Sequence, residues 1–276
     1  MNKEVFTAVT DALERGESAA LVTIVSTTGS TPQRVGAKML VFADGRMIGT
    51  IGGGCYENDA FWKAREAIAA RTPQLVHYEL SDDFAQETGL VCGGQMDVYI
   101  EPIEPSPELY IVGAGHVGFH LARLASDVGF RVHVVDDREK FANSERFPSA
   151  VEIVVDDIPA WMARANLPAH AYAVIVTRGH TNDLEALRAL APRDLRYLGL
   201  IGSRAKVARI YEALTEAQMP AELLTRVHAP IGLDIGAVTP QEIAVSILAE
   251  LIAVKHGKVN PASMRWTPPQ LSKSEV

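Results

Sequence analysis

The most constraining feature of this sequence is a glycine-spaced turn that directly follows a short apolar run. Residues 109–112 read Leu-Tyr-Ile-Val, and Gly113, Gly115 and Gly118 follow in the order Gly-x-Gly-x-x-Gly. The pattern alone is a weak signal, but here it opens a helical pattern, and a second apolar run ends in Asp136 about twenty residues further on. Such glycines permit a tight turn, a close approach of backbone amides to a phosphate, and close packing of helix on strand. The combination predicts a strand-turn-helix unit that binds the phosphate of an organic ligand at a helix N-terminus.

The remainder of the second half alternates between strand-like and helix-like segments. Strands are predicted at 109–112, 131–135, 151–155, 173–176 and 197–201, and helices at 116–127, 158–165, 182–191, 203–217 and 240–256. Strands and helices alternating at this spacing indicate right-handed crossovers and a parallel sheet covered on both faces. We therefore predict an α/β fold with a Rossmann-like domain over 108–257, followed by a polar tail over 258–276. The strongly apolar last helix is expected to pack against the sheet or against a second subunit.

The first half is predicted to be a smaller α+β domain over 1–104. Helical periodicity covers 2–15 and a segment that ends near residue 70, and strands are predicted at 19–25, 38–42, 46–50, 75–79 and 96–101. Prolines follow at positions 102, 105 and 107, where they remove backbone donors and favour extended geometry. This proline run is the predicted linker between the two domains.

Two further strand-to-helix connections carry polar residues at the sheet edge where ligands of open α/β folds bind. The candidates are Arg178, His180, Gly202, Ser203, Arg204 and Lys206. Ser203 is the expected N-cap of its helix. Arg204 and Lys206 lie in the first turn, where a cation is unfavourable against the helix dipole, so they are either solvated or ligands of an anion. His180 and Arg178 are expected to join the same crevice.

The first domain has glycine-rich loops, at 29–36 and directly before Cys55, that are too rich in glycine to be simple connections. Gly53 and Gly54 are therefore candidates for close contact with a ligand. Cys55, at a predicted helix start, and Cys92, beside two glycines, are candidate reactive thiols or soft metal ligands. Their spacing matches no zinc signature. On composition alone, two inert buried cysteines remain the alternative.

Composition limits the classes of function. The formal net charge of −8 argues against non-specific nucleic-acid binding, which depends on cationic side chains. No run of 18 apolar residues occurs, so no membrane span is expected, and the first residues lack the pattern of a signal peptide. Two cysteines are too few for a disulfide framework. A cytoplasmic protein is the expectation.

Taken together, seven motifs resemble the XdhC/CoxI family of xanthine dehydrogenase accessory proteins. They lie at 29–36, 52–57, 92–97, 113–118, 178–180, 199–206 and 231–244. The resemblance implies a maturation factor that binds molybdenum cofactor, helps its sulfuration and delivers it to a molybdenum hydroxylase such as xanthine dehydrogenase. It implies a cofactor-binding chaperone rather than an enzyme, with a cysteine desulfurase as a further partner. A homodimer is expected because two-fold pairs are the commonest assemblies.

Molybdopterin carries a phosphate, a dithiolene and a polar pterin. The glycine loops and Gly202-Ser203-Arg204 suit the phosphate, whereas Cys55 and Cys92 suit a soft molybdenum–sulfur centre. Two alternatives stay open. One is an NAD-dependent oxidoreductase, or a carrier that binds NAD or another nucleotide in addition, in which Asp136 accepts hydrogen bonds from a ribose and His180 acts as acid or base. The other is a structural adaptor that uses the helix at 240–256 as its interface.

Overall fold

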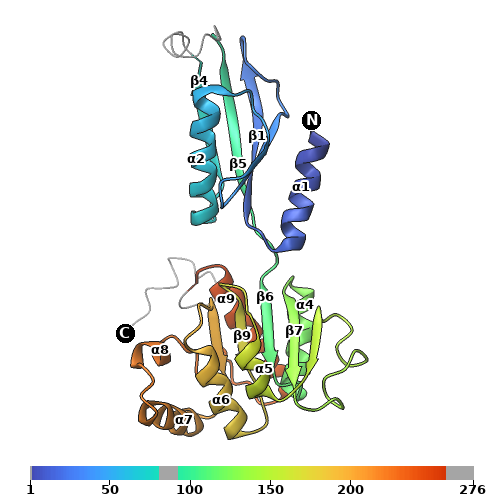
Figure 1. Ribbon diagram of the computed structural model, residues 1–276, viewed down its shortest axis with the longest axis vertical. Helices are drawn as coiled ribbons and strands as arrows, with labels where there is room; N and C mark the ends of the chain where they lie inside the picture. Colours follow the sequence, from blue (N-terminus) through green and yellow to red (C-terminus); the bar gives the residue numbers. More distant parts are fainter. Residues whose placement is uncertain (1, 81–92, 259–276) are drawn as a thin grey trace, which may run out of the picture. The chain divides into compact units, whose positions relative to one another are not determined.

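The computed structural model describes residues 2–80 and 93–258. The chain divides into two compact units, Met1–Ser106 (unit 1) and Pro107–Val276 (unit 2), and each is described by itself (Figure 1). Unit 1 contains an antiparallel sheet with helices, and unit 2 contains a parallel sheet between helices. The predicted α/β fold class with a Rossmann-like second half is thus confirmed. No helix of the described residues is long and apolar enough to cross a membrane.

Unit 1 is a sheet of five strands in the order β3-β2-β1-β5-β4. Its elements are α1 (Asn2–Arg15), β1 (Ala19–Thr28), β2 (Lys38–Phe42), β3 (Met47–Gly49), α2 (Gly54–Ala70), β4 (Gln74–Glu79) and β5 (Gln95–Ile103). Alternate residues of β2 face opposite sides, so Met39 and Val41 pack in the core beneath α2 while Leu40 and Phe42 pack with α1. The two helices therefore cover opposite faces of the sheet.

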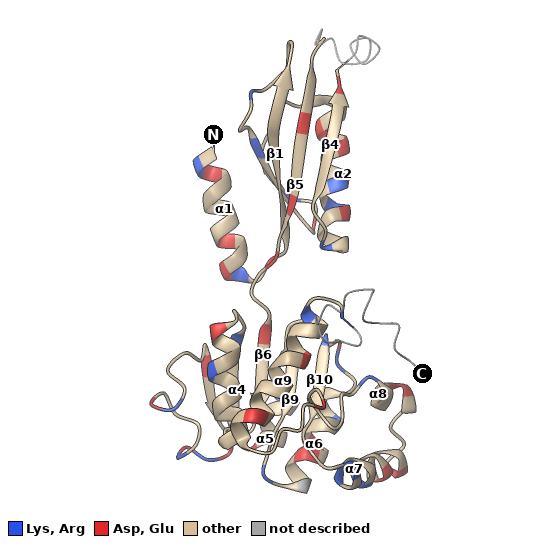
Figure 2. Cartoon of the chain, turned by 180° about the vertical axis from the view of Figure 1, so that it is seen from behind, with Lys and Arg blue, Asp and Glu red and all other residues tan. Residues whose placement is uncertain are grey.

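The strands that meet in the middle of unit 1 are longer than the sequence predicts. β1 continues to Thr28, and its register against β5 shifts between Ile24 and Ser26. This irregularity is a β-bulge, and the strand continues beyond it. The sequence predicts the end of the strand at residue 25, where the apolar run ends. Charged residues of both signs are interspersed along α1 and α2 (Figure 2).

Unit 2 is a parallel sheet of five strands in the order β10-β9-β6-β7-β8. Its elements are β6 (Glu108–Val112), α4 (His116–Asp127), β7 (Arg131–Asp136), β8 (Glu152–Val155), α5 (Ile158–Arg164), β9 (Tyr172–Ile175), α6 (His180–Leu190), β10 (Tyr197–Leu200), α7 (Arg204–Glu216), α8 (Ala221–Thr225) and α9 (Pro240–Lys255). From β6 the chain winds outward through β7 to β8, then returns to the other side of β6 for β9 and β10. The switch point of the topology is therefore between β6 and β9.

Helices cover both faces of this sheet. Residues of α4 and α9 share one core with the inner strands, and residues of α5, α6 and α7 share the other. In α9, Ile247 and Leu251 are buried in the first of these cores. Of the two roles predicted for the apolar last helix, the structure therefore supports packing on its own sheet. The side chains of α9 that pack in this core are not available to a partner, whereas Val245 on the same helix is 49% exposed.

Candidate functional site

The glycine-spaced turn lies at the carboxyl end of β6, in the middle of the parallel sheet. The amide of Gly113 donates to the carbonyl of Val135 on the β7 side at 2.8 Å, and the amide of Val176 donates to the carbonyl of Val112 on the β9 side at 2.8 Å. The turn is thereby fixed between the ends of both neighbouring strands. This is the edge and the switch point at which open α/β sheets bind their ligands.

The three glycines of the turn are required for different reasons. Gly113 has φ +119°, and a Cβ atom there would lie 2.5 Å from the carbonyl oxygen of Val176. A Cβ atom on Gly118 would overlap the carbonyl oxygen of Gly113. Gly115 differs from both, because its φ is −66° and a Cβ atom there would meet no atom within 4 Å. Protein packing thus explains the first and third glycines, while the open space over Gly115 leaves its backbone accessible to a ligand.

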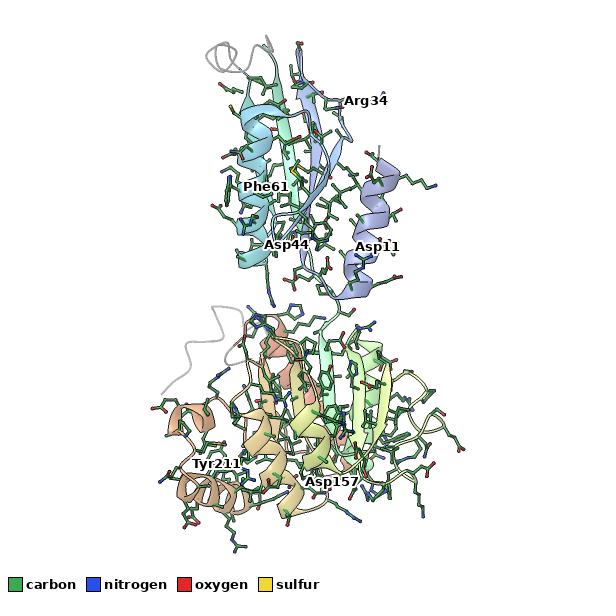
Figure 3. The ribbon with its side chains drawn as sticks, in the orientation of Figure 1. Asp11, Arg34, Asp44, Phe61, Asp157 and Tyr211 are labelled. Carbon is green, nitrogen blue, oxygen red and sulfur yellow. The ribbon has the colours of Figure 1, made fainter. Side chains whose placement is uncertain are left out.

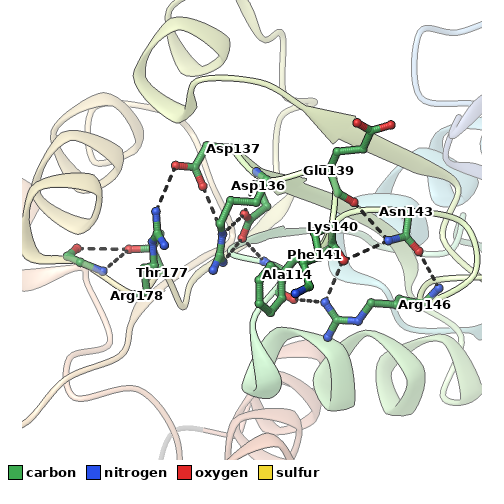
Figure 4. Close-up of polar contacts among 12 residues, drawn as sticks. Ala114, Asp136, Asp137, Glu139, Lys140, Phe141, Asn143, Arg146, Thr177 and Arg178 are labelled. Carbon is green, nitrogen blue, oxygen red and sulfur yellow. Dashed lines mark hydrogen bonds and ion pairs between the residues drawn. The ribbon is translucent and has the colours of Figure 1, made fainter.

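Two charged side chains hold Ala114, the residue between the first two glycines (Figure 4). Its amide donates to Oδ2 of Asp136 at 2.7 Å, and its carbonyl accepts from Nη1 of Arg146 at 3.0 Å. Arg146 also donates to the carbonyl of Phe141 at 2.9 Å, which ties the connection between β7 and β8 to the turn. Arg146 is absent from the predicted site residues, because no local pattern links it to a turn 32 residues earlier. The turn is therefore held in one conformation by its own unit.

Asp136 is buried, with a relative exposure of 2%, and its carboxylate is fully engaged. Oδ1 accepts from the backbone amide of Arg138 at 3.0 Å and from its Nε at 2.7 Å, while Oδ2 accepts from Nη2 of Arg138 at 2.8 Å and from Ala114. Burial raises the pKa of Asp136, but the bonds from Arg138 and the Ala114 amide outweigh it and the net pKa is lowered. These contacts do not support the expectation that Asp136 accepts hydrogen bonds from a ribose.

Arg178 lies at the same edge, directly after β9, and its side chain is 65% exposed. Its Nη2 is 3.9 Å from Oδ2 of Asp137, a contact too long to immobilise either group. Figure 4 shows the two side chains directed toward each other. His180 begins α6, one of the helices that start at this edge, and its side chain is outside the described part of the structure. Arg178 is thus a loosely held cation beside the glycine turn.

The second predicted glycine connection follows β10 and contains two cations with different roles. Lys206 is part of a structural ion pair, whereas Arg204 remains a candidate to bind an anion. Ser203 is the N-cap of α7, as predicted, and its Oγ accepts from the amide of Lys206 at 3.2 Å. The ammonium of Lys206 pairs with Oδ2 of the fully buried Asp183, whose Oδ1 accepts from Thr177 at 2.6 Å. Lys206 is therefore neither solvated nor a free anion ligand. Arg204 is exposed and has no ion pair with any described residue, so it remains the candidate.

In unit 1 three glycine segments, far apart in the sequence, meet at one end of the sheet. A Cβ atom on Gly29 would lie 3.0 Å from the Cα atom of Gly94, and one on Gly52 would lie 2.7 Å from the Cβ atom of Pro32. A Cβ atom on Gly94 would in turn approach the carbonyl oxygen of Thr28 at 2.6 Å. At these three positions the backbone approaches other protein atoms, which is the close approach that the glycine-rich loops predict.

Glu57, in the first turn of α2, occupies the loop before the helix. Its Oε2 accepts from the hydroxyl of Thr50 at 2.5 Å and from three backbone amides, those of Ile51 at 2.8 Å, Gly52 at 3.2 Å and Gly53 at 3.0 Å. Burial raises the pKa of Glu57, but these hydrogen bonds outweigh it and the pKa is lowered. The amide of Gly53 is thus already used by the protein, which leaves Gly54, with φ +80°, as the glycine of this loop that could contact a ligand.

Cys55 is the second residue of α2 and is half-buried and free. The N-terminus of α2 has no side-chain cap, because its N-cap is Gly53. Arg34, labelled in Figure 3, belongs to the glycine segment that packs beside this end, and it is exposed and without an ion pair among the described residues. Cys92 is outside the described residues. Within 2–80 and 93–258, no group of three or more His, Cys, Asp or Glu side chains is arranged to hold a metal ion.

The fold and the site define a class: a protein with a Rossmann-type ligand-binding unit joined to a smaller unit whose glycine loops converge beside a cysteine. Comparison with known families agrees with this description. A model of the XdhC Rossmann domain matches residues 109–251, and a model of the XdhC and CoxI family matches residues 12–79. The chain belongs to the XdhC/CoxI family.

Three relatives cover most of this chain. The uncharacterized protein YqeB of Escherichia coli is 36% identical over 96% of the chain, which spans 49% of that protein. A Bacillus subtilis protein, named as a probable subunit of xanthine dehydrogenase, is 27% identical, with 91% of this chain and 97% of the relative covered. The Escherichia coli molybdenum cofactor insertion chaperone PaoD is 25% identical, with 89% and 86% covered. The chain thus spans about half the length of the first of these relatives and most of the other two.

A solved structure also resembles the chain. It is described as a xanthine dehydrogenase from Bacillus halodurans, is 25% identical, and has a TM-score of 0.51 with 95% of this chain and 98% of that chain covered. Both units of the chain therefore have counterparts in a solved member of the same fold.

Proposed function

We propose that this protein is a maturation factor that binds molybdenum cofactor and delivers it to a molybdenum hydroxylase of the xanthine dehydrogenase type. The observation that carries the proposal is the glycine turn, in which Gly115 is open while the residue before it is fixed from both sides by Asp136 and Arg146. A turn held in place by side chains of its own unit is prepared to receive a phosphate at the N-terminus of α4. The cofactor is here the cargo, and its phosphate is the group we assign to this turn.

The names of the relatives support the kind of cargo. One relative is named a molybdenum cofactor insertion chaperone and another a probable subunit of xanthine dehydrogenase. Arg178 and Arg204 supply cations at the edge of the sheet that carries the turn, and neither is committed to a close ion pair within the described residues. Two loosely held cations beside an anion-binding turn suit a phosphorylated ligand that must later be released.

Unit 1 supplies the thiol of the proposal. Cys55 is half-buried in the first turn of α2, and a cysteine sulfur is a ligand that suits a soft molybdenum–sulfur centre. We extend the proposal to Cys92, Gly54 and His180 as further contacts of the cofactor. Help with sulfuration, by exchange with a cysteine desulfurase, and assembly as a homodimer are also part of the proposal.

A substitution at Gly115 tests the phosphate site without disturbing the fold. Gly115 is the N-cap of α4 in an extended conformation with open space around it, so Gly115→Asp should leave the stability unchanged or slightly higher. Its carboxylate would take the place of the phosphate. The full-length protein is incubated with molybdenum cofactor released from a molybdoenzyme, passed over a gel-filtration column, and its molybdenum content per chain is measured. We expect retention by the wild type and loss by Gly115→Asp.

Matched variants make the outcome specific. Ser149→Asp introduces the same charge at an exposed position of the connection between β7 and β8 and should retain the cofactor. Cys55→Ala tests the thiol of unit 1 in the same assay, and unchanged retention would remove that thiol from the proposed site. Equal retention by Gly115→Asp and the wild type would overturn the assignment of the phosphate to the turn.

The alternative of an NAD-dependent oxidoreductase has less support. The fingerprint that motivates it needs a carboxylate at the end of the second strand with free lone pairs for a ribose. In this structure that carboxylate, Asp136, accepts four hydrogen bonds from its own unit. Nucleotide binding is therefore not part of the proposed function.

A further inference from the structure

The carboxylate of Asp136 has no acceptor capacity left for a ligand. A carboxylate offers about four lone-pair sites. In this structure Oδ1 accepts from the amide and Nε of Arg138, and Oδ2 accepts from Nη2 of Arg138 and the amide of Ala114, all between 2.7 and 3.0 Å. With a relative exposure of 2%, Asp136 is also closed to solvent. Three of its four donors come from Arg138.

Arg138 is itself fixed in this position. Its guanidinium group lies 4.0 Å from the centroid of the Phe141 ring, and its Nε is 3.4 Å from Oδ1 of Asp137. The side chain is 22% exposed, so one edge reaches the surface while its plane is held between a carboxylate and an aromatic ring. A planar guanidinium that makes a two-point contact and also stacks is pre-organised, which a lysine at the same place would not be. The position of Arg138 is thus a property of the fold rather than a loose surface contact.

In a dinucleotide-binding fold, the carboxylate at the end of the second strand accepts hydrogen bonds from the hydroxyl groups of a ribose, which is attached to the bound pyrophosphate. Here the Arg138 side chain takes up the lone pairs that those hydroxyls would use. A ribose could bind only after Arg138 had left, and its departure would leave a buried carboxylate without a cation. The site can therefore accept a phosphate at Gly115 but not the ribose that a dinucleotide places beside it.

We infer that Arg138 excludes ribose from unit 2, so that the turn selects a phosphate monoester and rejects a dinucleotide. This inference rests on the proposed function and deepens it, because it names the form of the cargo: the cofactor without an attached nucleotide. Asp136 and Arg138 are then specificity-determining residues, which act by denying the ligand a hydrogen-bond acceptor. Asp136 has a second task, since it also positions Ala114 in the turn.

A titration of the full-length protein with two probes tests the inference. Inorganic pyrophosphate reports the anion site alone, and ADP-ribose adds the ribose of a dinucleotide. Calorimetry on the wild type should give a weaker affinity for ADP-ribose than for pyrophosphate, because Arg138 already uses the acceptor positions that the ribose needs. Arg138→Ala removes the two side-chain donors, Nε and Nη2, and so frees two acceptor positions on Asp136. ADP-ribose should then bind about tenfold tighter or more, as expected for a new hydrogen bond to a charged group. The affinity for pyrophosphate should stay close to that of the wild type.

Arg123→Ala is the matched control. It removes the same charge from an exposed position of α4 that makes no ion pair within the described residues, and it should leave both affinities unchanged. If Arg138→Ala does not fold, Arg138→Lys keeps the positive charge without the two-point contact and should show a smaller gain for ADP-ribose. The comparison of the two probes on the wild type decides the question independently of any variant.

Two results would overturn the inference. One is a wild type that binds ADP-ribose as tightly as pyrophosphate or more tightly, since a ribose would then be accommodated despite Arg138. The other is a folded Arg138→Ala protein that binds pyrophosphate normally and gains nothing for ADP-ribose. Neither result bears on retention of molybdenum cofactor in gel filtration, so a failure of the proposed function and a failure of this inference are distinguishable.

Discussion

The pair between Lys206 and Asp183 gives the sharpest test of how unit 2 is built. Asp183 is completely buried and accepts from Thr177 at 2.6 Å, while Lys206 is 19% exposed and is the cation that compensates its charge. Lys206→Met would leave the buried carboxylate with one hydrogen bond and no counter-charge. Removing one partner of a buried ion pair destabilises a protein by about 3–5 kcal/mol. In a domain of this size that corresponds to a decrease in melting temperature of about 6–20 °C.

The partner substitution should have a smaller effect, which makes the prediction specific. Asp183→Asn keeps an acceptor for Thr177, and the stranded ammonium of Lys206 can turn toward solvent, so the loss should be about 1–3 kcal/mol. The double variant removes both charges and should be more stable than the sum of the two single effects predicts, with a coupling of about 0.5–3 kcal/mol. Urea unfolding followed by tryptophan fluorescence and circular dichroism measures all three.

Arg204→Met is the control, because it removes a cation from the same helix turn without breaking an ion pair of the described residues. It should change the unfolding free energy by less than about 0.5 kcal/mol. The reasoning is refuted if Lys206→Met and Arg204→Met have equal effects on stability. Equal effects would instead favour the sequence-based interpretation of Lys206 as a free ligand of an anion.

Three further predictions concern other parts of the chain. Gly118→Ala places a Cβ atom onto the Gly113 carbonyl oxygen, so thermal unfolding should show a loss of about 1–3 kcal/mol, and an unchanged melting temperature would contradict the close packing. His133 lies between Glu108 and Glu152; burial lowers its pKa, but their hydrogen bonds outweigh it and raise it. The contribution of protonated His133 to the free energy of unfolding is therefore complete below its pKa in the unfolded chain, about 6.5, and is lost as pH rises through its pKa in the folded protein. Urea unfolding should show a free energy that decreases over this pH range, and His133→Gln should abolish the decrease. Glu57→Gln should lower the unfolding free energy of unit 1 by about 1–3 kcal/mol in urea at neutral pH. Because the pKa of Glu57 is lowered in the folded protein, this difference from the wild type should disappear as pH falls below about 4 and Glu57 becomes protonated. A difference that persists in acid would contradict this.

Local patterns in the sequence are sufficient for the elements and for the turn. The apolar runs and the glycine spacing around 113–118 are contiguous, so the strand, turn and helix there can be predicted together. The connection between β7 and β8 consists of turns and bends without a helix. The short helix α8, with five residues, is not predicted because so short a helix carries little periodicity.

The chemistry of the site depends on side-chain pairings that the sequence does not display. The sequence predicts Lys206 as solvated or anion-binding, yet its partner Asp183 lies on the preceding helix and is brought to it only by the packing of α6 against α7. It predicts that Asp136 faces a ribose, but the side chain of Arg138, two residues away, turns back onto it. In both cases the residue can be identified from the sequence and its partner cannot, because partners follow from tertiary packing and rotamers rather than from spacing.

The central claim is that the turn at 113–118 holds the phosphate of the cofactor. Hydrogen exchange measured by mass spectrometry on the full-length protein, with and without molybdenum cofactor released from a molybdoenzyme, tests it directly. The amides of Gly115 and His116 begin α4 without a side-chain cap, so they should exchange more slowly when the cofactor is bound. Bound cofactor with no change of exchange in the peptides that cover this turn would contradict the claim.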